Sequence, residues 1–181
     1  WLLNKQGDAV GLTTFDDEVK TIVPARYRPG QLRRLMVSLE EQPSGKQTRP
    51  AVALEDAAQR LRKRGLVILI SDLLAPVQEL GDGLRLLRGC LHDMVVFQVL
   101  DRAEKNLTFD GPRLFEDLET DQKIYADPNL VRNEYVNRLE AHNTAVRQEC
   151  DSVGAAFRQL VTDEPLELAL AEFLQARRQI R

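Results

Sequence analysis

The sequence predicts an α/β fold: a mostly parallel, doubly wound sheet with an antiparallel edge hairpin and helices on both faces. Residues 66–70 form a continuous apolar run and residues 94–100 an apolar run interrupted only by Gln98, a pattern typical of parallel strands that are covered on both sides. Amphipathic helical patterns alternate with these runs along the chain. Strand–helix alternation of this kind builds a parallel sheet between two layers of helices.

The first part of the chain predicts a helix end followed by a hairpin. Residues 1–6 form the last turn of a helix that stops at Gly7, where a left-handed backbone is easiest. Residues 9–15 and 19–23 are the two strands, and the second alternates apolar with polar residues, as an edge strand does. Pro24 is expected to end this strand, because proline lacks the N–H that a ladder needs.

Helices and strands alternate from there to the C-terminus. Residues 105–127 are expected to be a small hairpin insertion with strands at 107–109 and 114–118, and residues 157–161 a last strand. Four helices are expected to bury the following apolar residues: Leu32, Leu35, Met36 and Leu39; Leu54, Ala57, Ala58 and Leu61, after Pro50; Leu80, Leu84 and Leu87; and Val131, Tyr135, Leu139, His142, Val146 and Cys150, after Pro128. A closing helix, capped by Asp163, should bury Leu166, Leu170, Phe173 and Leu174.

Length and composition limit the class of protein. The 181 residues are enough for one domain, residues 1–181, with its own core. The net charge of −3 argues against nucleic acid as a partner, and no apolar run is long enough for membrane contact by this fragment. Two cysteines are too few for a disulfide scaffold, which favours a cytoplasmic location. Because the chain begins with Trp1 rather than Met, we expect it to be truncated at its N-terminus.

Carboxylates follow two of the predicted strands. Asp72 comes directly after the first buried strand and Asp101 after the second, with Glu104 close behind. Ligands of parallel α/β sheets gather at the carboxyl ends of strands, so these side chains are candidates for a site. Asp72 could equally cap the following helix, and Asp101 fits a solvated turn.

Other patterns favour structural explanations. Cys90 and His92 are too few ligands for a zinc site, and His142 fits a core or boundary position on the long helix. Residues 81–83 place two glycines inside a helix, which is not a dinucleotide-binding motif. One basic group complements a helix C-terminus (Arg60, Arg62, Lys63 and Arg64), and a second flanks the hairpin and could face an acidic partner (Arg26, Arg28, Arg33 and Arg34).

Five blocks of sequence, taken together and in order, resemble domain-of-unknown-function family 58. They are residues 6–12, 64–72, 92–101, 115–120 and 162–166, and they extend over essentially the whole chain. The resemblance implies a von Willebrand factor A-like, Rossmann-type fold. It also implies a MoxR-type AAA+ ATPase as a partner, since such ATPases are often encoded beside members of the family.

The resemblance further implies a metal-ion-dependent adhesion site at the carboxyl edge of the sheet. The threonine ligand of that site falls on Thr48 and the aspartate ligand on Asp72, whereas the Asp-x-Ser-x-Ser stretch that completes it is absent from this chain. Arg49 follows Thr48 where an acidic residue would be expected. We therefore expect no tight Mg²⁺ binding by this fragment, and leave Mg²⁺ or another divalent cation open for the full-length protein.

Three functions follow from these observations. The first is a protein-binding or adaptor module, not an enzyme, that meets a protein partner such as a MoxR-type AAA+ ATPase through the edge around Thr48 and Asp72. The second is a Mg²⁺-dependent phosphoester hydrolase, which requires Asp72, Asp101 and Glu104 to converge. The third is a structural domain that self-associates through residues 105–127.

Overall fold

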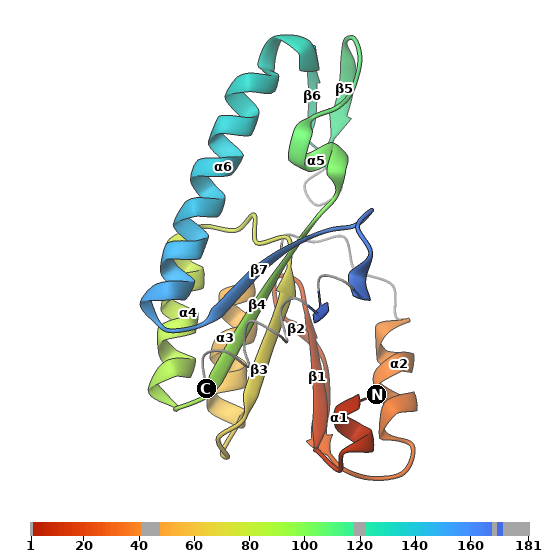
Figure 1. Cartoon of the computed structure of the whole chain (residues 1–181), viewed down its shortest axis with the longest axis vertical. Coiled ribbons are helices and arrows are strands. Elements are labelled where there is room, and N and C mark those ends of the chain that lie inside the picture. Colours follow the sequence, from red (N-terminus) through yellow and green to blue (C-terminus); the bar gives the residue numbers. More distant parts are fainter. Residues whose placement is uncertain (1, 41–47, 118–121, 168–169, 172–181) are drawn as a thin grey trace.

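The computed structural model describes residues 2–40, 48–117, 122–167 and 170–171, and it has a mixed α/β architecture (Figure 1). The helices are α1 (Leu2–Lys5), α2 (Gln31–Leu39), α3 (Pro50–Arg60), α4 (Val77–Gly89), α5 (Arg102–Asn106) and α6 (Pro128–Ser152). The strands are β1 (Val10–Phe15), β2 (Val19–Arg26), β3 (Leu66–Ser71), β4 (Asp93–Leu100), β5 (Arg113–Glu116), β6 (Lys123–Ala126) and β7 (Ala156–Val161).

Three strands form the predicted parallel sheet, in the order β3-β4-β7. Helices α3, α4 and α6 supply side chains to one apolar core together with this sheet; its most deeply buried members include Leu54, Leu84, Leu87, Val96 and Val146. A smaller cluster around Val95 and Phe97 lies on the opposite face of the sheet, and none of the helices named above contributes to it. The parallel sheet is confirmed, but helices on both faces are not found in the described part of the chain.

Strand β3 is more exposed than its composition predicts. Leu66, Ile68 and Ile70 are 43%, 45% and 62% exposed. These alternate residues share a sheet face with the cluster around Val95 and Phe97, which the helices named above do not cover in the described part of the chain. Full burial of this strand was therefore a wrong prediction. In the expected closing helix, Leu166 and Leu170 are exposed, and Phe173 and Leu174 lie outside the described residues.

The predicted hairpin is present as β1 and β2, but as a separate two-stranded sheet rather than an edge of the parallel one. It packs beside α3, which also contacts α4. Strand β2 continues through Pro24 to Arg26, so the expected stop at Pro24 was wrong. The register shifts beside Gly11, whose absent side chain leaves room for the backbone of Ala25, and this irregularity accommodates the proline.

Helix α2 lies on the hairpin with only part of the predicted face inward, since Leu32 and Leu35 are half-buried. Gln31 is buried, and its amide donates to the backbone oxygens of Val10 (2.8 Å) and Pro24 (3.0 Å). Met36 and Leu39, which the apolar stripe predicted to be inside, are 54% and 59% exposed. The polar anchor at the first turn therefore determines how the helix is rotated.

The insertion at residues 105–127 contains a hairpin, as predicted. The strand expected at 114–118 is present as β5, whereas its partner is β6 rather than residues 107–109. Strands β5 and β6 pair from Arg113↔Ala126 to Glu116↔Lys123, so residues 107–109 belong to neither strand. The short helix α5, which the sequence did not predict, precedes the hairpin and overlaps the insertion at residues 105 and 106. The third candidate function depended on self-association by this segment, which the structure of one chain leaves as a prediction.

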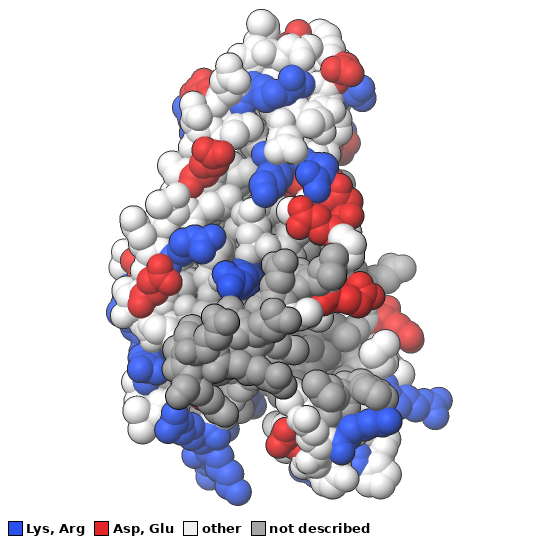
Figure 2. Space-filling model, in the orientation of Figure 1, with Lys and Arg blue, Asp and Glu red and all other residues white. Residues whose placement is uncertain are grey.

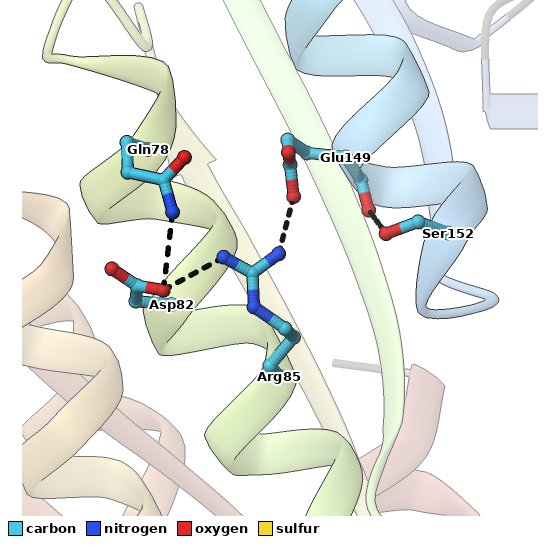
Figure 3. Close-up of polar contacts among 5 residues, drawn as sticks. All are labelled: Gln78, Asp82, Arg85, Glu149 and Ser152. Carbon is cyan, nitrogen blue, oxygen red and sulfur yellow. Dashed lines mark hydrogen bonds and ion pairs between the residues drawn. The ribbon is translucent and has the colours of Figure 1, made fainter.

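Helix α4 is joined to its neighbours by a close contact and by an ion-pair bridge. At Gly83, an added Cβ would lie 2.8 Å from Leu54 Cδ1 and 2.9 Å from Leu54 Cβ, so the glycine is what lets α3 approach α4. On the other side, Arg85 binds Asp82 of its own helix and Glu149 of α6, each at 2.7 Å (Figure 3). None of the helices in the described ranges is long and apolar enough to cross a membrane.

The contact at Gly83 leads to a prediction about stability. Gly83→Ala should lower the free energy of unfolding by about 1 kcal/mol, because overpacking costs about 1–3 kcal/mol and outweighs the helix-propensity gain of about 1 kcal/mol. Gly89→Ala is the matched control, since a Cβ there meets nothing within 4 Å. Chemical denaturation of both variants measures the difference, and equal stability of the two would contradict the packing argument.

Candidate functional site

The turn after β3 presents Asp72 at the carboxyl edge of the parallel sheet. The Asp72 carboxylate accepts hydrogen bonds through Oδ1 from the Ser71 hydroxyl (3.2 Å) and from the backbone N–H of Leu74 (3.3 Å). Leu73, which is almost completely buried, has a φ of 57°. A left-handed backbone at a residue other than glycine costs roughly 1–2 kcal/mol, so this turn is strained.

The same turn is anchored from behind by polar side chains of β4 and α6. The amide of Gln98, which is fully buried, donates to the backbone oxygen of Asp72 at 3.0 Å and to Asn143 Oδ1 at 2.8 Å. His142 donates from Nε2 to the backbone oxygen of Leu73 at 2.7 Å. These bonds hold the strained backbone in place, and they confirm His142 as a boundary residue.

Asp72 does not cap the helix that follows. Helix α4 begins at Val77 with Pro76 at its N-cap, and no side chain accepts a hydrogen bond there. The capping interpretation of Asp72 was therefore wrong. Oδ2 of Asp72 makes no hydrogen bond with any residue of the described ranges. One carboxylate oxygen of this half-buried residue is therefore available at the carboxyl edge of the sheet, which we call the rim.

Thr48 lies where α3 meets the turn of the β1–β2 hairpin. The next residue, Arg49, donates its backbone N–H to the oxygen of Asp16 in that turn, at 2.8 Å. Helix α3 ends at Arg60 shortly before β3 starts, so its first turn points toward the end at which β3 finishes (Figure 1). Thr48 and Asp72 are thus on elements that run to the same end of the sheet.

Asp101 and Glu104 have structural partners in α5. Asp101 accepts from the Ala103 N–H (2.8 Å) and from the Thr162 hydroxyl (2.8 Å), and Glu104 accepts from the Asp101 N–H (2.8 Å). These two carboxylates form a capping box, which explains them without a catalytic role. The bond from Ala103, followed by that from Thr162, lowers the pKa of Asp101.

The donor set does not fit a complete magnesium site. Mg²⁺ needs octahedral oxygen coordination, with one or two carboxylates in most sites. Asp72 brings one carboxylate and Ser71 a hydroxyl that already donates to it, and the described residues contain no group of three or more His, Cys, Asp or Glu side chains that could hold a metal. The two residues predicted as ligands, Thr48 and Asp72, therefore provide part of a site at most.

The remaining candidates have structural roles. Cys90 is exposed at the end of α4, whereas Cys150 is buried in the core, where burial raises the pKa of its thiol to about 12. His92 is also buried, and its Nδ1 accepts the Gly65 N–H at 3.3 Å, which links the starts of β3 and β4. Neither cysteine lies in a metal-binding cluster of the described residues.

The fold is that of a mixed α/β protein with a parallel three-stranded sheet and antiparallel hairpins. Residues 1–145 match the model of the family described as "Protein of unknown function DUF58", and the chain belongs to this family.

Relatives of this chain are found in mycobacteria. An uncharacterized protein of Mycobacterium tuberculosis and one of Mycobacterium bovis are each 26% identical over 95% of this chain and 55% of their own length. The chain thus spans about half the length of these curated relatives. An uncharacterized protein of Mycobacterium avium is 27% identical over 87% of this chain and 95% of its own.

One solved structure also matches, a crystal structure of an uncharacterized membrane spanning protein from Vibrio fischeri. The match covers 99% of this chain and 80% of that one, at 16% identity and a TM-score of 0.27. That score is below the level at which a common fold can be concluded.

The hydrogen bond from Thr162 to Asp101 can be tested by titration. Thr162→Val removes a donor to the Asp101 carboxylate, so the pKa of Asp101 should rise toward its ordinary value. A lowered pKa in the folded state contributes stability that is fully present above the ordinary pKa and is lost as the pH falls through the folded-state pKa. In the variant this contribution should be smaller, and its loss should be complete at a higher pH. Carboxyl NMR titration measures the shift, with Thr108→Val as the exposed control; an unchanged Asp101 pKa would show that the hydroxyl bond is unimportant.

Proposed function

We propose that this chain is a protein-binding module of the von Willebrand factor A-like class, which meets its partner through the carboxyl edge around Asp72 and Thr48. The observation that carries the proposal is the strained turn at Leu73, held by buried polar contacts behind it and presenting a carboxylate oxygen in front. Backbone strain persists only where the surroundings impose it, and it concentrates at functional sites.

The chemistry of this edge suits recognition better than catalysis. A nucleophile–base pair or a set of converging carboxylates would favour an enzyme. Here Asp101 and Glu104 are bound to the first turn of α5, and His142 is bound to a backbone oxygen. What remains at the rim is one rigidly held acidic side chain, which fits a basic group of a partner or completes a cation site together with ligands from elsewhere.

The partner class follows from the family resemblance. Members of the family are often encoded beside MoxR-type AAA+ ATPases, which makes such an ATPase the partner we propose. The chain spans about half of its curated mycobacterial relatives, so the rest of a full-length protein can supply further contacts and further cation ligands.

The proposal predicts a specific loss of binding. Asp72→Ala in the full-length protein should weaken binding to a MoxR-type AAA+ ATPase from the same organism about tenfold or more, because a charge-assisted contact is lost. Biolayer interferometry with and without Mg²⁺ measures the affinity. Asp151→Ala, an exposed carboxylate near the C-terminal end of α6, is the control; equal affinity of both variants would remove the edge from consideration.

A further inference from the structure

A second surface, formed by α2 and the end of β2, exposes apolar side chains to solvent. Met36, Val37 and Leu39 are 54%, 52% and 59% exposed, and Tyr27 on the connection before the helix is 63% exposed. Because Gln31 is held inside by the hairpin backbone, the helix cannot rotate to bury these residues. Contiguous exposed apolar surface of this kind marks an interaction site more often than isolated apolar residues do.

This surface contains a groove. A cavity of about 400 Å³ lies between β2 and α2. Its apolar lining comes from Ile22, Val23, Pro24 and Val37, and its polar lining from Ser38 and three arginines, Arg28, Arg33 and Arg34. We call this feature the α2 groove. Its volume is within the range of pockets that receive a small molecule or a few side chains of a peptide.

The charge of the groove is opposite to that of the chain. Residues 21–40 contain four arginines, no lysine and one carboxylate, Glu40, while the whole chain carries a net charge of −3. Within the described ranges, none of the four arginines forms an ion pair; only Arg28 has a polar side-chain contact, with Gln31 at 3.3 Å. Basic side chains stand over the lower right of Figure 2, where Figure 1 places α2. No carboxylate of the described residues therefore neutralises the arginines of the groove, and their charge suits an anionic partner.

We propose that the α2 groove binds an acidic segment of a partner protein whose apolar side chains enter the cavity while its carboxylates pair with Arg28, Arg33 and Arg34. Arginine forms bidentate hydrogen bonds with carboxylates, and it is enriched with tyrosine and methionine in protein interfaces. The arginines line the groove, and Tyr27 and Met36 are exposed on the surface around it. This surface lies on other elements than the edge around Asp72, so the inference does not depend on the proposed function.

Two other anionic partners fit less well. A bilayer surface would meet the exposed apolar residues but would leave the cavity between β2 and α2 unfilled. Proteins that bind single-stranded nucleic acid use several exposed aromatic side chains, which stack on the bases along a basic path. The 21–40 segment has one aromatic residue, Tyr27. An acidic peptide uses both the cavity and the charges.

The experiment uses short fluorescein-labelled peptides in which Leu and Phe occur at several spacings among Glu and Asp, read by fluorescence anisotropy with the full chain. We expect at least one acidic peptide to bind, matched peptides with Lys in place of the acidic residues not to bind, and affinity to fall with added salt. Replacing Arg33 and Arg34 by Glu should weaken binding about tenfold or more, because like charges then face each other. Val37→Ser should weaken it by removing apolar contact.

The matched control is the replacement of Arg62 and Lys63 by Glu, which changes the net charge equally on an exposed segment after α3. Both charge-reversal variants alter exposed side chains, and circular dichroism verifies their folds. Retained binding in the control and lost binding in the groove variant support the proposal. It is overturned if no acidic peptide binds, if both variants weaken binding equally, or if phosphatidylglycerol vesicles bind through these arginines while the peptides do not.

Discussion

The carboxyl edge of this protein depends on the hydrogen bonds of the buried Gln98 amide. Its nitrogen donates to the Asp72 backbone and to Asn143, and its oxygen accepts from Gln159 Nε2 at 3.0 Å. One side chain of β4 thereby joins the turn after β3, the middle of α6 and the neighbouring strand β7. Because a buried amide without partners costs about 1–3 kcal/mol, the network defines one arrangement of these elements rather than several. The strained turn at Leu73 can persist only on such a support.

The elements that local sequence determines were predictable. Strands β3 and β4 are largely apolar, whereas β7 includes Arg158 and Gln159. Helices α4 and α6 carry apolar stripes, so the type and order of these elements follow from periodicity. The position of the hairpin did not follow, because it depends on which strand edges pair across long sequence distances: β1 and β2 pair with each other and leave β3 as an edge. The rotation of α2 about its axis could not be predicted from the sequence either. It depends on the buried amide of Gln31, whose hydrogen bonds to the backbone of β1 and β2 outweigh the apolar stripe.

The candidate site was predictable only in part. A carboxylate after a parallel strand is a local signal, and it pointed correctly to the rim where Asp72 stands. The residues that support it, Asn143 and Gln159, gave no local signal, because they are brought together from α6 and β7 by the fold. Gln98 did leave one: it is the single polar residue inside the apolar stretch of β4, and burying a polar group there requires partners. Asp101 also left a local signal, because Glu104 follows it at the spacing of a capping box, but the hydrogen bond from Thr162 depends on the fold.

The hairpin connects the two proposed surfaces. Its turn accepts the Arg49 N–H beside Thr48, and its second strand lines the α2 groove. No ladder hydrogen bond joins the hairpin to the parallel sheet in the described residues, so packing against α3 and the hydrogen bond from the Arg49 N–H to Asp16 hold it in place. The α2 groove and Thr48 both border this hairpin, whereas Asp72 is held from the other side by Gln98 of β4. The two residues of the carboxyl edge are therefore held by different parts of the molecule.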